Sequence, residues 1–194
     1  MDNRITFKQY RNIDIGILCL VTAVFEAVAT LATSKWFPGQ PMAISITLAL
    51  TLIAMHRWSW YAAPIPVAGG IIFCLLSSAS LQHFVIYCGG NLLALASLVY
   101  FKAFGKEAVR RNFLKMLLFT STAYVAVAAG RFLCSLPFGA DFSELVGFIA
   151  SDILSLLFAV VILWIFKDVD GLVEDQKAYL FRLEKQRQAE KGAE

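Results

Sequence analysis

Three ionisable side chains stand inside long apolar runs of this 194-residue chain, namely Glu26, Arg131 and Asp152. A charge among apolar residues is costly, so such groups usually face an opposite charge or a polar cavity. A guanidinium group recognises a carboxylate or phosphate through two parallel hydrogen bonds, whereas two carboxylates suit a cation. These three residues therefore lead the candidates for a binding site, and the sequence leaves an anionic and a cationic ligand open.

Other polar and aromatic residues are expected near these charges. They are Tyr87, Asn91, Tyr124, His83 and, just after the first apolar run, Trp36. Tyrosine rings can stack on a flat ligand, and an asparagine amide both donates and accepts hydrogen bonds. A plainer alternative is that Arg131 and Asp152 form an internal ion pair in a low-dielectric setting. Such a pair can also be part of a binding site.

The elements that carry these residues are expected to be membrane-spanning helices. The chain is 59% hydrophobic and 16% charged, with a mean hydropathy of +0.68, whereas soluble domains are about half apolar and a quarter charged. A spanning helix needs about 20 apolar residues. The apolar runs cover residues 13–37, 41–56, 62–80, 81–101, 113–136 and 145–166. The sequence therefore predicts an all-α integral membrane protein with six transmembrane helices.

The distribution of Lys and Arg predicts the orientation of these helices. Fifteen of the 17 basic residues fall in the first segment, in alternate loops and in the tail, and the other side holds only Lys35 and Arg131. Basic residues are retained on the cytoplasmic side, so both termini are expected in the cytoplasm. The expected location is the cell membrane, as a multi-pass protein. The candidate residues then form a polar pocket open to the outside, and the remaining helix faces contact membrane lipid.

The sequence lacks the residue motifs that define several classes of function. It contains no H-E-x-x-H, no G-x-S-x-G and no phosphate-binding glycine loop. The four cysteines lie singly in apolar runs, so they are interpreted as packing residues, and no metal or cofactor is expected. The net charge of +3 comes from loop residues, so a nucleic-acid partner is not expected. A membrane enzyme that uses Glu26 or Asp152 as a base would need a second catalytic group, so no enzyme activity is expected.

Two surfaces are candidates for partner binding. On the first span, Gly16, Leu20, Ala23 and Ala27 follow helical spacing and form a stripe that another helix could approach closely. The charged tail, residues 167–194, places apolar residues at helical spacing and is expected to form an amphipathic cytoplasmic helix beside the membrane domain, residues 1–166. Its polar face is mixed in sign, which favours protein contact or solvation over an anionic lipid surface.

This layout resembles the substrate-binding S component of energy-coupling factor (ECF) vitamin transporters. The features that match are six short spans, cytoplasmic ends, a basic fourth loop and the Ala23-x-x-x-Ala27 pair. In that family the first-helix alanines face a transmembrane coupling subunit, ATPase subunits supply energy, and the substrate lies near the outer surface. The resemblance implies that Ala23 and Ala27 dock the coupling subunit and that the loop Ser34–Gln40, with Trp36 and Phe37, is a lid. It also makes four residues substrate contacts: Tyr87, Asn91, Arg131 and Asp152.

The function expected from these features is capture of a small vitamin-like solute from outside, with transport driven by other chains. The charged tail departs from the short ending usual in the family. The alternative expectation is a structural or regulatory membrane protein that docks partners through its first helix and its tail. In that case Arg131 and Asp152 are only an internal bridge.

Overall fold

The computed structural model describes residues 6–36 and 44–191, and in these ranges every regular element is helical. The all-α prediction is therefore confirmed. The helices are α1 (Phe7–Trp36), α2 (Thr47–Trp58), α3 (Pro64–Leu76), α4 (Leu81–Phe84), α5 (Val99–Phe104), α6 (Lys106–Arg111), α7 (Phe113–Ser135), α8 (Phe142–Ser151), α9 (Ile153–Phe166) and α10 (Gln176–Lys191). Tighter or wider turns join some of them: η1 (Ser59–Ala62), η2 (Val85–Gly89), η3 (Leu92–Leu98) and η4 (Leu136–Phe138).

Several of these helices are long and apolar enough to cross a membrane. Within the described ranges, three qualify alone, Phe7–Trp36, Leu81–Phe104 and Phe113–Phe138. Two bent pairs raise the number to five if each counts as one span: the pair that includes α2 and α3 is bent by 113°, and α8 with α9 by 43°. The protein is therefore a candidate membrane protein with three to five spanning helices, and helix length alone does not establish the six predicted crossings.

The difference from the predicted layout lies mainly in α2. A helix was predicted over residues 41–56, but α2 begins at Thr47, and residues 41–43 lie outside the described part of the chain. Its 12 residues are about 18 Å long, well short of the roughly 30 Å of a bilayer core. All of them except Leu50 are buried, so α2 is a central helix surrounded by the rest of the chain.

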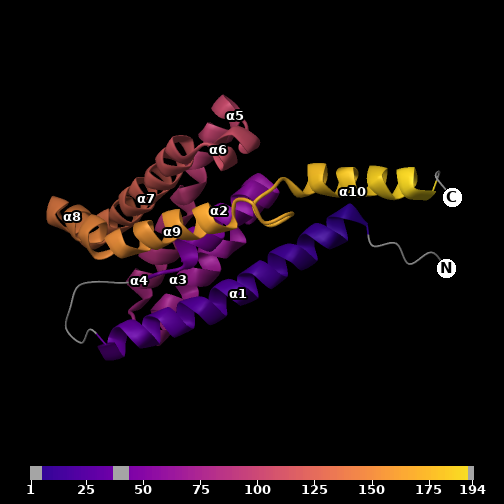
Figure 1. Ribbon diagram of the computed structural model, residues 1–194. Helices are drawn as coiled ribbons and strands as arrows, with labels where there is room; N and C mark the ends of the chain where they lie inside the picture. The colour runs from indigo at the N-terminus through magenta and orange to yellow at the C-terminus, as the bar shows by residue number, and fades with distance from the viewer. Residues whose placement is uncertain (1–5, 37–43, 192–194) are drawn as a thin grey trace.

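Polar contacts tie both ends of α2 to α1. Glu26 of α1 accepts a hydrogen bond from the Thr47 backbone, and Asp14 of α1 binds Arg57 through two nitrogens, at 2.9 and 2.7 Å. The two acidic residues are separated by about 18 Å along α1, because a helix rises about 1.5 Å per residue. Thus α2 runs antiparallel to α1 between the levels of Glu26 and Asp14. α1 lies along one side of the molecule, with α3 against it (Figure 1).

The continuous helical segment Leu81–Phe104, which comprises α4, η2, η3 and α5 and is called the rod below, crosses α7 at two glycines. A Cβ atom on Gly90 would come within 2.5 Å of the Arg131 backbone nitrogen, and one on Gly130 within 2.5 Å of the Gly90 carbonyl oxygen. The two backbones can approach this closely only without side chains at these positions. This crossing brings Asn91 next to Arg131.

The beginning of the tail belongs to the bundle. Val173 and Gln176 are 2% and 1% exposed, and Val173 lies in the same hydrophobic core as α2 and α7. Arg57 donates hydrogen bonds to the Gly171 and Leu172 carbonyls, and Lys106 binds Asp175. Beyond this segment α10 leaves the bundle and projects beside the start of α1 (Figure 1).

Candidate functional site

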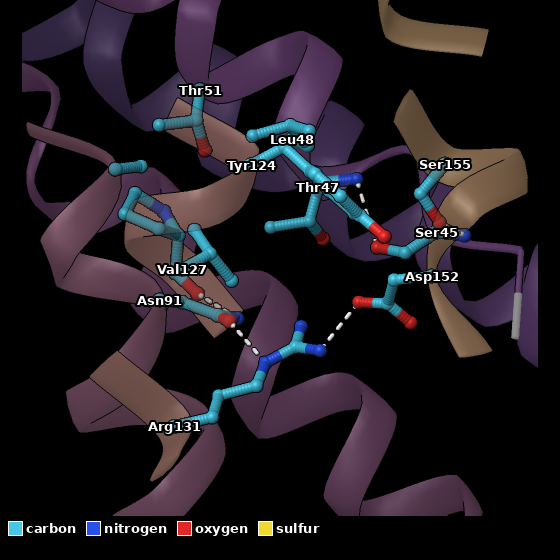
Figure 2. Close-up of a pocket in the computed structure, with 12 residues that line it drawn as sticks. Ser45, Thr47, Leu48, Thr51, Asn91, Tyr124, Val127, Arg131, Asp152 and Ser155 are labelled. Carbon is cyan, nitrogen blue, oxygen red and sulfur yellow. Dashed lines mark hydrogen bonds and ion pairs between the residues drawn. The ribbon is translucent and has the colours of Figure 1, made fainter. Parts of the chain in front are cut away.

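Arg131 is the centre of a buried polar cluster. It comes from α7, is 6% exposed, and donates from Nε to Asn91 Oδ1 at 3.0 Å and from Nη1 to Asp152. Asn91 in turn donates from its amide to the Pro66 carbonyl at 3.3 Å. Figure 2 shows the guanidinium group between Asn91 and Asp152, with its remaining terminal nitrogen directed into the space among the residues drawn.

Asp152 reaches Arg131 because a helix is interrupted there. α8 ends and α9 begins at this residue, and its side chain makes no capping hydrogen bond to α9. Two tyrosines complete the surroundings. Tyr124 donates to the Ile149 carbonyl in the last turns of α8, and the Arg131 guanidinium lies 4.5 Å from the ring centroid of Tyr87. The aromatic face therefore supports the cation from one side.

Glu26 has a different task. Its Oε2 atom accepts hydrogen bonds from the Ser45 hydroxyl at 2.9 Å, from the Ile46 and Thr47 backbone N–H groups at 3.1 and 3.2 Å, and from the Thr47 hydroxyl at 2.8 Å. The first N–H groups of a helix have no partners within the helix, and an acidic group near them is favourable. Glu26, which is 2% exposed, therefore caps α2 from a neighbouring helix.

Two small cavities adjoin this cluster. One of about 20 Å³ is lined by residues that include Tyr124, Asn91, Arg131 and Asp152, and one of about 10 Å³ has Glu26 and Tyr87 in its wall. A cavity of roughly 10–15 Å³ admits one water molecule. A larger solute therefore requires side chains of the cluster to move aside.

The structure brings together six of the eight predicted substrate contacts, from α1, the Leu81–Phe104 segment, α7 and the junction of α8 with α9. His83 lies at the edge of this group. It is exposed and bonds to the Ser80 hydroxyl at 2.8 Å, and its ring is stacked on that of Tyr87 with 6.4 Å between centroids. Trp36 lies apart and is 75% exposed at the end of α1. Of the predicted lid Ser34–Gln40, residues 37–40 are outside the described part of the chain.

Sequence reasoning missed the hydroxyl residues of the site, which are Ser45, Thr47, Thr51 and Ser155. The first two lie just before and at the start of α2. Serine and threonine are typical of helix starts, and this was the available signal. It was overlooked because the predicted helix began several residues earlier.

The predicted docking stripe faces outward. A Cβ atom on Gly16 would meet nothing within 4 Å, and Ala23 and Ala27 are half-buried. Their apolar neighbours Leu20 and Val28 are 65% and 61% exposed. In the part of the chain that the structure describes, this face is covered only in part, at Ala23 and Ala27.

The cysteines and acidic residues form no further centre. All four cysteines are free, and no group of three His, Cys, Asp or Glu residues in the described ranges could hold a metal ion. No family model, curated protein or solved structure matches the chain. The function is therefore argued from the site itself.

Proposed function

We propose that this chain is the solute-binding membrane subunit of an uptake system, of the kind represented by ECF S components. It would bind a small vitamin-like solute at the Arg131 cluster, and coupling and ATPase subunits on other chains would drive transport. The observation that carries the proposal is the state of Arg131. This buried arginine lines a cavity, and its Nη2 atom has no hydrogen-bond partner among the described residues.

A comparison within the chain supports a binding role for this arginine. Arg57, which joins α2 to α1 and to the tail, engages all three of its guanidinium nitrogens and holds Asp14 through two of them. Arg131 holds Asp152 through one nitrogen only. The second terminal nitrogen of Arg131 instead faces the cavity, where an acceptor on an entering solute can reach it (Figure 2).

The proposed topology has six crossings with both termini in the cytoplasm. The chain leaves α1 at Trp36 and is back at the depth of Glu26 when α2 begins, so α2 is the described helical part of the second crossing. Basic residues gather at one end of the bundle, where Arg57 contacts the tail and Lys106 binds Asp175. The positive-inside rule makes this end cytoplasmic. The outward stripe with Ala23 and Ala27 is then available to a transmembrane coupling subunit.

The test is native mass spectrometry of the gently purified protein. We expect a retained small molecule and co-purifying coupling and ATPase subunits. In the double variant Arg131→Gln with Asp152→Asn, which keeps a neutral hydrogen-bonded pair, the retained mass should disappear. Arg111→Gln is the control, because Arg111 is 75% exposed and far from the site along the chain. An empty protein that co-purifies only with chains unrelated to transport would contradict the proposal.

One observation favours the alternative of a partner-docking protein. α10 projects from the bundle, and its Phe181 is 72% exposed (Figure 1). The separating variant must keep the buried segment up to Gln176, so it combines Phe181→Ser with removal of residues 185–194. Solute retention should survive this change if the chain is a solute-binding subunit. Loss of all partners with no solute present at any stage would favour the docking protein.

A further inference from the structure

We propose that the solute is a carboxylate and that it binds by replacing Asp152 on Arg131. The inference rests on the proposed function, since it names the class of ligand for the same site. The sequence left anions and cations open, because the candidate site combines one arginine, Arg131, with two carboxylates, Glu26 and Asp152. The contacts of the two carboxylates now separate these possibilities.

Glu26 is not available to a cation. One oxygen of its carboxylate accepts four hydrogen bonds at the start of α2, and the group is almost fully buried. To bind a cation it would have to give up some of these donors, and the buried Thr47 hydroxyl and the partly buried Ile46 N–H group would lose their acceptor. The negative charge of Glu26 already stabilises the start of α2.

Asp152 is also bound, but its partner Arg131 can bind another carboxylate in its place. Its contact with Arg131 uses one terminal nitrogen, and the second terminal nitrogen has no partner among the described residues. A carboxylate that entered the cavity could bind both nitrogens in the fork geometry that arginine favours. The incoming group thus gains two hydrogen bonds where Asp152 holds one.

The surrounding backbone also favours an anion here. α2 starts at Thr47 and α9 at Ile153, and Ser45, Thr47, Asp152 and Ser155 from these two helix starts line the cavity beside Arg131. The N-terminal end of a helix carries partial positive charge. The α2 start is already neutralised by Glu26, but the α9 start and the guanidinium group make the cavity electropositive once Asp152 has moved away. A cation would meet both.

The exchange also explains how a nearly closed site can admit a solute. The cavity of about 20 Å³ has no room for more than a water molecule while Asp152 is bound to Arg131. Asp152 lies at the break between α8 and α9, so its side chain can leave together with a change at this bend. Binding of the carboxylate and opening of the cavity then occur together.

The test measures binding of matched acid and amide probes to the purified protein in lipid nanodiscs. The probes are nicotinate with nicotinamide and biotin with biotinamide, and thiamine is the cationic probe. The readouts are the thermal unfolding midpoint and native mass spectrometry. At least one acid should raise the midpoint where its amide and thiamine do not.

Two variants give opposite expectations. Asp152→Asn removes the competing carboxylate, so the acid should bind about tenfold more tightly. Arg131→Gln with Asp152→Asn should fold, because the pair remains neutral, and should lose the acid. Arg111→Gln is the matched single-charge control and should bind the acid as the unchanged chain does.

Three results would overturn the carboxylate assignment. These are equal binding of acid and amide, weaker acid binding by Asp152→Asn, or no stabilisation by either acid. If thiamine or an amide binds in their place, the chain still binds solutes and only the ligand class is wrong. If nothing binds and no solute is retained on purification, the proposed function fails as well.

Discussion

Glu26 supplies the acceptor that the start of α2 needs in the interior of the bundle. Replacing it with leucine removes the acceptor for two backbone N–H groups and two hydroxyls. We expect Glu26→Leu to lower the free energy of unfolding by about 3 kcal/mol, because several buried donors lose their partner. Glu26→Gln keeps an acceptor oxygen and should stay within about 1 kcal/mol of the unchanged chain. Thermal unfolding in detergent compares the two, and equal losses would show that the cap is unimportant.

The glycines at the crossing of α7 with the Leu81–Phe104 rod give a second test at the residue scale. Gly130→Ala puts a methyl group 2.5 Å from the Gly90 carbonyl oxygen, so the backbones must separate and we expect a loss of about 2 kcal/mol. Gly147→Ala is the matched control, since nothing lies within 4 Å of its added methyl group. Alanine is the better helix former, so this control should gain up to about 1 kcal/mol. Losses of similar size in both variants would contradict the close crossing.

The sequence identified the charged members of the site and named the Arg131–Asp152 ion pair as one alternative, which the structure shows, but it did not identify the partners of Glu26. Glu26, Arg131 and Asp152 stood out because each is charged in an apolar run. What each one binds depends on which helices meet, and the spacing along one chain does not contain that. The serine and threonine hydroxyls at the start of α2 are an example. Nothing in their spacing relates them to Glu26, which accepts their hydrogen bonds in the folded chain.

At the scale of elements, α8 is the part best placed to move. None of its residues is buried. It is held by the Tyr124 hydroxyl on the Ile149 carbonyl and by edge contacts of Phe148 on Tyr87 and of Phe142 on Phe132, at 6.4 and 6.3 Å between ring centroids. These contacts lie on one side of the bend at Asp152.

Removing the single hydroxyl should therefore loosen α8 alone. We expect Tyr124→Phe to speed hydrogen–deuterium exchange in residues 142–151 by about five- to tenfold, the effect of losing about 1 kcal/mol. Exchange in α9 should not change. Tyr100→Phe removes a comparable hydroxyl contact, with Thr122 at 3.0 Å, and should leave α8 unaffected. Faster exchange throughout the bundle would show that Tyr124 stabilises more than this element.

The tail segment is held by an ion pair that depends on pH. Partial burial raises the pKa of Asp175, but the hydrogen bond and charge of Lys106 outweigh it and hold the pKa below its usual range. A lowered pKa stabilises the fold above the ordinary carboxyl value of about 3.9, and this contribution is lost as the pH falls through the lower folded value.

At neutral pH, Asp175→Asn imitates that loss. The pair is partly exposed, so we expect a modest drop of about 0.5–1 kcal/mol in the local stability of residues 171–180. Hydrogen-exchange protection of this segment measures it, and the exposed Asp170→Asn is the control. If acidification to pH 3 leaves the protection unchanged, the ion pair does not anchor the tail.

Helix length and apolar runs predicted the long elements well, because α1, the Leu81–Phe104 rod and α7 are continuous stretches with few interruptions. The short α2 and the bend at Asp152 could not be predicted in the same way. The residues just before α2 and those around Asp152 are mostly apolar, so their composition does not mark where α2 begins or where the later helix bends. Both places carry contacts to other helices, from Glu26 at one and from Arg131 at the other.

At the scale of the whole molecule, the proposal requires a partner on the outer face of α1. A leucine at Ala27 would hold another helix away, since close packing depends on small side chains. We expect Ala27→Leu to reduce the co-purifying coupling subunit about tenfold while solute binding is unchanged. Ala103→Leu adds the same bulk at an exposed position on α5 and should have no effect. Loss of solute binding in Ala27→Leu would show a folding defect and not a docking defect.

The cap on α2 also has a consequence for biogenesis. In the proposed topology α1 is synthesised before α2, so while α1 enters the membrane the Glu26 carboxylate has none of the donors that later surround it. A lone carboxylate at the centre of a bilayer opposes insertion by several kcal/mol. The favourable order is therefore for α1 to wait at the translocon until residues 45–47 have been made, and to enter the lipid together with α2 and α3 as one insertion unit.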